Sequence, residues 1–199
     1  MDAAALRQRY GEVHPLAKDK VLPRLDRHAR AFIALSPFLV LGTADADGNQ
    51  DTSPRGDPPG FVQVRDERTL LIPDRPGNRR VDSLANIAAQ PKVGLLFLVP
   101  GFDETLRVNG SARLDVDPEV LAGLSVQGRP ALLAIVVTVE EVFFHCSKAF
   151  IRSRLWDPAA RVERSRLPTL GRIIADQIAG VDAGAADRDI DADYRSGLY

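Results

Sequence analysis

The chain has 199 residues, of which 45% are hydrophobic and 27% charged, and its formal net charge is −1. This composition is typical of a soluble globular protein with a substantial core, and the near-zero charge argues against nucleic acid or an anionic membrane as a partner. No apolar run approaches the roughly 20 residues of a membrane span, the N-terminus has no apolar secretory core, and a single cysteine excludes an internal disulfide, so we expect a cytoplasmic protein.

The first 35 residues have a helical, amphipathic pattern that is interrupted by two prolines. Asp26 is expected to cap a helix that runs to Leu35, with Phe32, Ile33 and Leu35 on its buried side. We interpret residues 1–35 as an N-terminal helical extension.

Strand-like segments follow one another at short intervals between residues 36 and 146. Apolar alternation and turn residues predict strands over residues 38–43, 50–55, 61–65, 69–72, 92–101, 104–116 and 131–146. Helices are predicted from about 81 to 89 and after the pair Asp117-Pro118. Many strands with few helices favour a closed or nearly closed antiparallel barrel, and the absence of a glycine-rich fingerprint after a strand argues against a Rossmann fold.

The last part of the chain, residues 147–199, is expected to hold C-terminal helices and a tail. Ser147 is a candidate cap for a helix over residues 148–156, another helix is predicted near residues 170–179, and an Asp- and Ala-rich tail ends at Tyr199. We expect this part, the extension 1–35 and the barrel 36–146 to form one structural domain.

The usual signatures of catalysis are missing. The three histidines are scattered and there is no CxxC pair, so no metal site is expected, and neither a GxSxG nor a Walker motif occurs. His145 and Cys146 are adjacent, but neighbouring residues on a strand point to opposite faces and cannot pair there. A structural cysteine is therefore favoured over a Cys/His nucleophile.

The segment LLIPDRPGNRRVDSLANI leads from a strand into a helix through Asn78, Arg79 and Arg80. The first turn of a helix has free N–H groups and a partial positive charge, and arginine presents a planar fork that suits phosphate. The alternative is a solvated helix start in which the arginines pair with Asp74 or Asp82, and the spacing does not decide between the two. Cations at a helix start oppose its macrodipole, which favours a bound anion.

Six segments in order resemble the pyridoxamine 5′-phosphate oxidase-like family of FMN-binding split barrels, in a branch of FMN-dependent enzymes. They span most of residues 26–158 and read SPFLVLGTADADG, SPRGDPPGFV, LIPDRPGNRRVDSLANI, LLFLVPG, ETLRVNGSARL and FFHCSKAFIRSRLWDP. The resemblance implies a mainly β (α+β) fold, a six-stranded antiparallel split β-barrel with flanking helices and helical N- and C-terminal extensions. It also implies a homodimer with FMN in the groove between the subunits.

The resemblance assigns cofactor contacts to particular positions. It places Arg55, followed by Gly56 and Asp57, near the flavin ring and the ribityl chain, and it places Pro73 and Asp74 beside the cofactor. The basic pair Arg79-Arg80, preceded by Asn78, would clamp the phosphate. Thr105 would reach the cofactor from the partner chain, at a position where the oxidase has glutamine.

The C-terminal part departs from the oxidase, whose substrate-phosphate arginines and terminal Trp/Arg signature are not recognisable here. On the expected helix, Lys148 and Arg152 share a face by their spacing of four residues. One interpretation places both at the mouth of the flavin groove, facing an anionic substrate or the cofactor, with Trp156 as a stacking wall. The plainer alternative is that Trp156 anchors the helix on the core while the basic residues are solvated.

The resemblance therefore implies an FMN-dependent oxidoreductase that acts on a small, anionic or phosphorylated substrate by two-electron transfer at the flavin. No side chain needs to act as a nucleophile, so no catalytic residue is named. Two other classes stay open, a flavin- or haem-binding carrier or sensor without turnover and a nucleic-acid-binding barrel. The near-zero net charge and the lack of interleaved surface aromatics argue against the latter.

Overall fold

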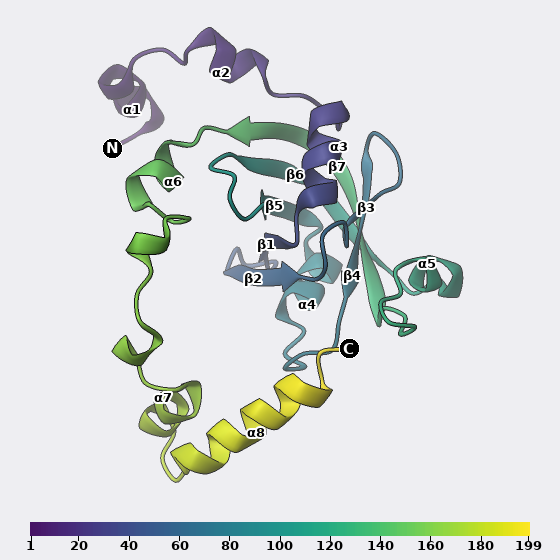
Figure 1. Cartoon of the computed structure of the whole chain (residues 1–199). Coiled ribbons are helices and arrows are strands. Elements are labelled where there is room, and N and C mark those ends of the chain that lie inside the picture. The colour runs from purple at the N-terminus through teal and green to yellow at the C-terminus, as the bar shows by residue number, and fades with distance from the viewer.

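One antiparallel sheet of seven strands organises the computed structural model, which describes residues 1–199 (Figure 1). The strands are β1 (Phe38–Ala44), β2 (Gln50–Gly56), β3 (Gln63–Val64), β4 (Thr69–Asp74), β5 (Lys92–Leu98), β6 (Thr105–Asp115) and β7 (Leu133–His145). The helices are α1 (Ala3–Tyr10), α2 (Pro15–Asp19), α3 (Arg27–Leu35), α4 (Asp82–Ala89), α5 (Pro118–Gly123), α6 (Lys148–Ser153), α7 (Leu170–Gln177) and α8 (Ala183–Ser196), with short 3₁₀ turns η1 (Pro158–Ala160) and η2 (Arg164–Arg166). None of the α-helices has both the length and the apolar character needed to cross a membrane.

The strand order across the sheet is β2-β1-β5-β6-β7-β4-β3. The mainly β fold class with flanking helices is confirmed, and the two-residue strand β3 is an addition to the six strands that the resemblance implies. The sheet does not close, because β2 and β3 are its two ends and share no ladder. This leaves β2 facing β4 across an open seam, and side chains rather than backbone hydrogen bonds connect them there.

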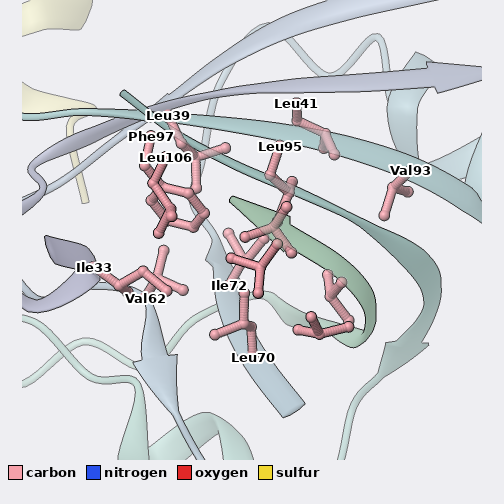
Figure 2. Close-up of a cluster of buried hydrophobic side chains, with 14 of the residues drawn as sticks. Ile33, Leu39, Leu41, Val62, Leu70, Ile72, Val93, Leu95, Phe97 and Leu106 are labelled. Carbon is pink, nitrogen blue, oxygen red and sulfur yellow. The ribbon is translucent and has the colours of Figure 1, made fainter. Parts of the chain in front are cut away.

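The core lies on the concave side of the curled sheet, where apolar residues from β1, β4, β5, β6 and β7 meet those of α3 (Figure 2). Leu39, Ile72, Phe97 and Leu106 are completely buried. Because such side chains are close-packed, replacing one of the leucines by alanine is expected to cost about 2–5 kcal/mol. This core fixes the positions of β2 and β4 beside the seam.

Helix α3 confirms part of the prediction for the N-terminal extension. The carboxylate of Asp26 accepts a hydrogen bond from the Ala29 N–H at 2.8 Å, as a cap should, and Phe32 and Ile33 are buried. Leu35, however, is 52% exposed, so its prediction as a buried residue was wrong. At about 100° per residue Leu35 lies roughly 200° from Ile33, on the side of the helix that faces away from the sheet.

Beyond β7 the chain forms an arm, residues 147–199, that leaves the barrel and returns to it beside β4 and α4 (Figure 1). The predicted helix over residues 148–156 is shorter, since α6 ends at Ser153 and Arg154 has a left-handed backbone (φ 54°). Ser147 does not cap it, because its hydroxyl donates to Glu104 at 2.8 Å instead. The Asp- and Ala-rich tail is mostly the helix α8, which begins at the cap Asp182.

Candidate functional site

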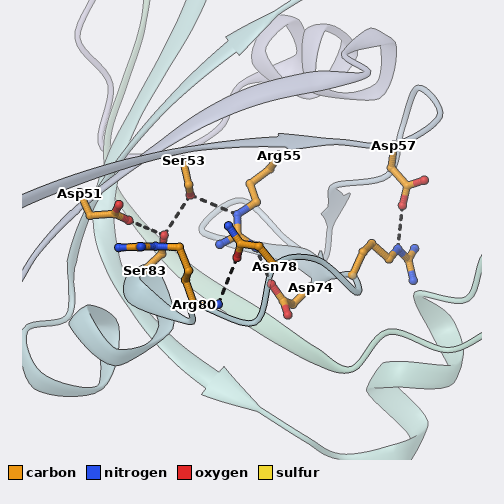
Figure 3. Close-up of polar contacts among 9 residues, drawn as sticks. Asp51, Ser53, Arg55, Asp57, Asp74, Asn78, Arg80 and Ser83 are labelled. Carbon is orange, nitrogen blue, oxygen red and sulfur yellow. Dashed lines mark hydrogen bonds and ion pairs between the residues drawn. The ribbon is translucent and has the colours of Figure 1, made fainter. Parts of the chain in front are cut away.

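Two ion pairs bridge the seam between β2 and β4 (Figure 3). Arg55 of β2 pairs with Asp74 at the end of β4, and Asp57 pairs with Arg75 at 2.8 Å between Oδ2 and Nε. All four side chains are largely buried. The two ion pairs therefore set the distance between β2 and β4, which no backbone hydrogen bonds fix. The loop to α4 begins directly after β4.

Strand β2 presents a row of polar side chains to α4. Asp51, Ser53 and Arg55 alternate with exposed residues and share one face of the strand. Arg55 Nε donates to Ser53 Oγ at 3.3 Å, Ser53 Oγ lies 2.9 Å from Ser83 Oγ, and Ser83 Oγ donates to Asp51 Oδ2 at 2.6 Å. This chain fixes Arg55 relative to the start of α4.

The sequence interpretation did not include Asp51, Ser53 or Ser83. The sequence gives them no clear signal, because residues 50 and 52 are also polar and no period of two separates one face of the strand from the other.

The loop from Asn78 to Asp82 has an unusual backbone. Arg79 and Val81 both adopt left-handed conformations, with φ of 59° and 55°, which is strained for a β-branched valine. Asn78 Oδ1 accepts a hydrogen bond from the Arg80 N–H at 3.1 Å, and Val81 stands at the N-cap of α4. No side chain caps α4, so its first-turn N–H groups remain available for an anion.

The two arginines of this loop differ in their contacts. Arg79 is exposed and makes no ion pair, whereas Arg80 Nε lies 2.7 Å from Asp82 Oδ2. The pairing of Arg80 with Asp82 is the alternative that the sequence left open, and Asp74 pairs with Arg55 rather than with this loop. Because the Arg80 side chain is 72% exposed, its ion pair is weak and does not oppose binding of a phosphate.

Asp57 is the most enclosed acid of the region, with a side chain only 1% exposed. Its Oδ2 accepts from Arg75, and its Oδ1 accepts from the hydroxyl of Tyr199 at 2.7 Å. The hydrogen bond to Asp57, together with burial, raises the pKa of Tyr199 above its ordinary value. The guanidinium of Arg75 also donates to the Leu124 carbonyl at 2.8 Å and lies 5.9 Å from the Tyr199 ring centroid.

Most of the sequence-predicted residues meet where β2, β4 and the loop to α4 come together. Gly56 ends β2 opposite Phe38, and Pro73 is buried in β4 opposite Ala134. The predicted residues that share this region are Arg55, Gly56, Asp57, Pro73, Asp74, Asn78, Arg79 and Arg80. Thr105 is not among them in the same chain, because it is buried at the start of β6 opposite His145.

The predicted residues of the arm lie elsewhere. Lys148 and Arg152 are exposed on α6, well apart from α4 (Figure 1). The indole of Trp156 donates to the Phe102 carbonyl at 2.7 Å and its ring lies 5.6 Å from that of Phe150. Within one chain these residues do not reach the seam.

The structure does not bring together the side chains of a metal site or of a Cys/His nucleophile. No three side chains of the His, Cys, Asp and Glu type come together in a way that could hold a metal ion. His145 lies against Phe143, with ring centroids 5.0 Å apart, and burial together with Arg107 and Lys20 lowers the pKa of its imidazole. Cys146 is exposed at the end of β7.

Comparison with known proteins gives one family match. Residues 25–146 match the model of the family described as pyridoxamine 5′-phosphate oxidase. No curated protein sequence matches the chain.

Among solved structures, HupZ from Group A Streptococcus has 17% identity over 60% of this chain and 93% of its own, with a TM-score of 0.49. An FMN-binding protein from Syntrophomonas wolfei has 16% identity over 72% and 96%, with a TM-score of 0.47. A Clostridium acetobutylicum protein related to general stress protein 26 has 15% identity over 59% and 85%, with a TM-score of 0.46. At these values the likenesses define neither a ligand nor an activity for this chain.

Proposed function

This chain belongs to the pyridoxamine 5′-phosphate oxidase family, and from that premise we propose that it is an FMN-dependent oxidoreductase with its cofactor site where β2, β4 and α4 meet. The observation that carries the proposal is the loop from Asn78 to Asp82. It holds two strained left-handed residues before a helix whose start has no side-chain cap. Such strain persists where the surrounding structure enforces it, and it is concentrated at ligand-binding sites.

The phosphate would lie at the start of α4. The free N–H groups of the first turn point along the helix axis, and the partial positive charge there favours an anion. Arg79 has no competing carboxylate, and Arg80 has only a weak, exposed one. Both guanidinium groups can therefore turn to the phosphate oxygens, and each charge-assisted contact is worth about 1.5–3 kcal/mol.

Arg55 would contact the remainder of the cofactor from β2. Its guanidinium is held in place by Asp74 and Ser53, so little conformational freedom is lost when it binds a ligand. Bound FMN would supply two-electron transfer to or from a small substrate, while Arg55 and the seam around it would orient the cofactor and exclude water. We propose an anionic or phosphorylated substrate, because three candidate residues outside the phosphate loop, Arg55, Lys148 and Arg152, are also basic.

A second copy of the chain would complete the site. The arm exposes eight large apolar side chains, which a partner could cover: Ile151, Leu155, Val162, Leu167, Leu170, Ile178, Tyr194 and Leu198. In a symmetric dimer Lys148, Arg152 and Trp156 would enter the groove from the partner, since they do not reach the seam of their own chain. Thr105 is buried within its own chain and is left out of this proposal. Light scattering of the FMN complex tests this, and a monomer mass at micromolar concentration would remove Lys148, Arg152 and Trp156 from the site.

Titration of the purified protein with FMN and with riboflavin tests the phosphate site directly. Flavin fluorescence reports binding, and the expected result is that FMN binds at least about a hundredfold more tightly than riboflavin, which lacks the phosphate. Equal affinities would overturn the phosphate assignment. If FMN is held but no NADH, NADPH or deazaflavin donor reduces it, the carrier or sensor function replaces the oxidoreductase.

A further inference from the structure

The far end of the arm is fastened to the same region as the candidate cofactor site. Tyr199 is 142 residues from Asp57 in the chain, yet its hydroxyl donates to Asp57 Oδ1 at 2.7 Å. Its backbone carbonyl accepts from Arg129, and its ring lies beside the guanidinium of Arg75. Three separate contacts therefore hold one residue, which is more than a passing surface contact provides.

The contact with Asp57 satisfies an atom that nothing else satisfies. The Asp57 side chain is 1% exposed, and its other oxygen is occupied by Arg75. The hydroxyl of Tyr199 is the hydrogen-bond donor that the structure gives Oδ1. A buried carboxylate oxygen without a donor is costly, so removal of the hydroxyl should loosen the Asp57–Arg75 ion pair.

That ion pair lies next to the proposed cofactor contacts on both strands. Asp57 is two residues beyond Arg55 on the β2 side, and Arg75 directly follows Asp74 on the β4 side. Arg75 also begins the loop that carries Asn78, Arg79 and Arg80. A change in the Asp57–Arg75 pair would therefore shift Arg55 relative to the phosphate loop.

We propose that Tyr199 is a positioning residue of the cofactor site, which holds the seam at the width that suits bound FMN. This inference rests on the proposed function. Tyr199 acts through Asp57 and Arg75 and does not itself touch the cofactor. Because coupling between two sites is reciprocal, bound FMN must strengthen the attachment of Tyr199 by the same factor by which Tyr199 strengthens the binding of FMN.

The variant Tyr199→Phe keeps the ring and the backbone contact and removes only the hydroxyl. One hydrogen bond corresponds to a change of about two- to tenfold, so FMN should dissociate from this variant about two- to tenfold faster than from the wild type. The control is Tyr10→Phe, which changes an exposed tyrosine of α1 outside the arm and should leave the rate unchanged.

A second measurement reports on Tyr199 without any turnover. Hydrogen exchange of residues 183–199 should slow by the same factor when FMN is added to the wild type, and FMN should have no such effect in Tyr199→Phe. The inference would be overturned by an unchanged FMN dissociation rate in Tyr199→Phe. It would also be overturned if FMN did not change the hydrogen exchange of residues 183–199 in the wild type. Either result would leave Tyr199 as a structural anchor. A wild type that does not bind FMN would instead overturn the proposed function itself.

Discussion

The two ion pairs that bridge the seam look alike and differ in what surrounds them. In the Asp57–Arg75 pair both carboxylate oxygens are occupied, and Arg75 also donates to a backbone carbonyl. In the Arg55–Asp74 pair the arginine donates to one aspartate and to one serine and faces the uncapped start of α4. From this comparison we propose a division of roles, in which the first pair holds the barrel together and the second contacts the ligand.

The largest expected effect comes from breaking the enclosed pair. Asp57→Ala leaves Arg75 buried without its partner and removes the acceptor of Tyr199, so the free energy of unfolding should fall by about 3–5 kcal/mol. Denaturant unfolding of the cofactor-free protein measures it. A loss below about 1 kcal/mol would mean that the pair does not hold the seam.

The next effect concerns the loop before α4. Changing Arg79 and Arg80 together to alanine should weaken FMN about a hundredfold or more, because two charge-assisted contacts are lost. The unfolding free energy should change little, since both side chains are exposed. The double variant Arg65→Ala and Arg68→Ala is the matched control, because it removes the same charge from an exposed hairpin, and its FMN affinity should be that of the wild type.

The variant Arg55→Ala distinguishes the roles of the two ion pairs most directly. Loss of one contact should weaken FMN about tenfold, whereas the unfolding free energy should fall by less than in Asp57→Ala, since Asp57→Ala also removes the acceptor of the Tyr199 hydroxyl. Isothermal titration and denaturant unfolding on the same sample give both values. A larger stability loss than in Asp57→Ala would reverse the assignment of roles.

The smallest expected effect is a pH dependence of the stability that the Tyr199 hydroxyl contributes. The pKa of Tyr199 is raised in the folded protein, so its hydrogen bond contributes fully below the ordinary value of 10.0 and is lost as the pH rises through the folded pKa. The difference in unfolding free energy between the wild type and Tyr199→Phe should be about 1 kcal/mol at neutral pH and should vanish above that folded pKa. A difference that does not change with pH would mean that the hydroxyl does not donate to Asp57.

Much of the barrel could be predicted because its information is local. Alternating apolar residues and turn chemistry located every strand within a few residues, and Asp26 identified the start of α3. The errors arose where tertiary contacts or propensity override a simple pattern. Ser147 has the residue type of a cap but donates to Glu104, and the polar composition of residues 183–196 concealed an alanine-rich helix.

The candidate site was predictable in part for a similar reason. The loop with Arg79 and Arg80 was selected from its position between a strand and a helix, which the structure confirms, while its contact with a phosphate stays a prediction. Arg75 and Tyr199 could not be found, because the contact of Tyr199 with Asp57 joins residues that only the folded arm brings together. Local sequence patterns do not detect a contact between residues that lie so far apart in the chain.

The bond between Trp156 and Phe102 has a practical consequence for spectroscopy. Trp156 is the only tryptophan of the chain, and it sits at the root of the arm with its indole on a barrel carbonyl. Intrinsic tryptophan emission therefore reports on the detachment of that root from the barrel. The only thiol, Cys146, is exposed directly after β7, so a dye attached there would form a donor–acceptor pair with the indole and report the distance between the end of β7 and the root of the arm.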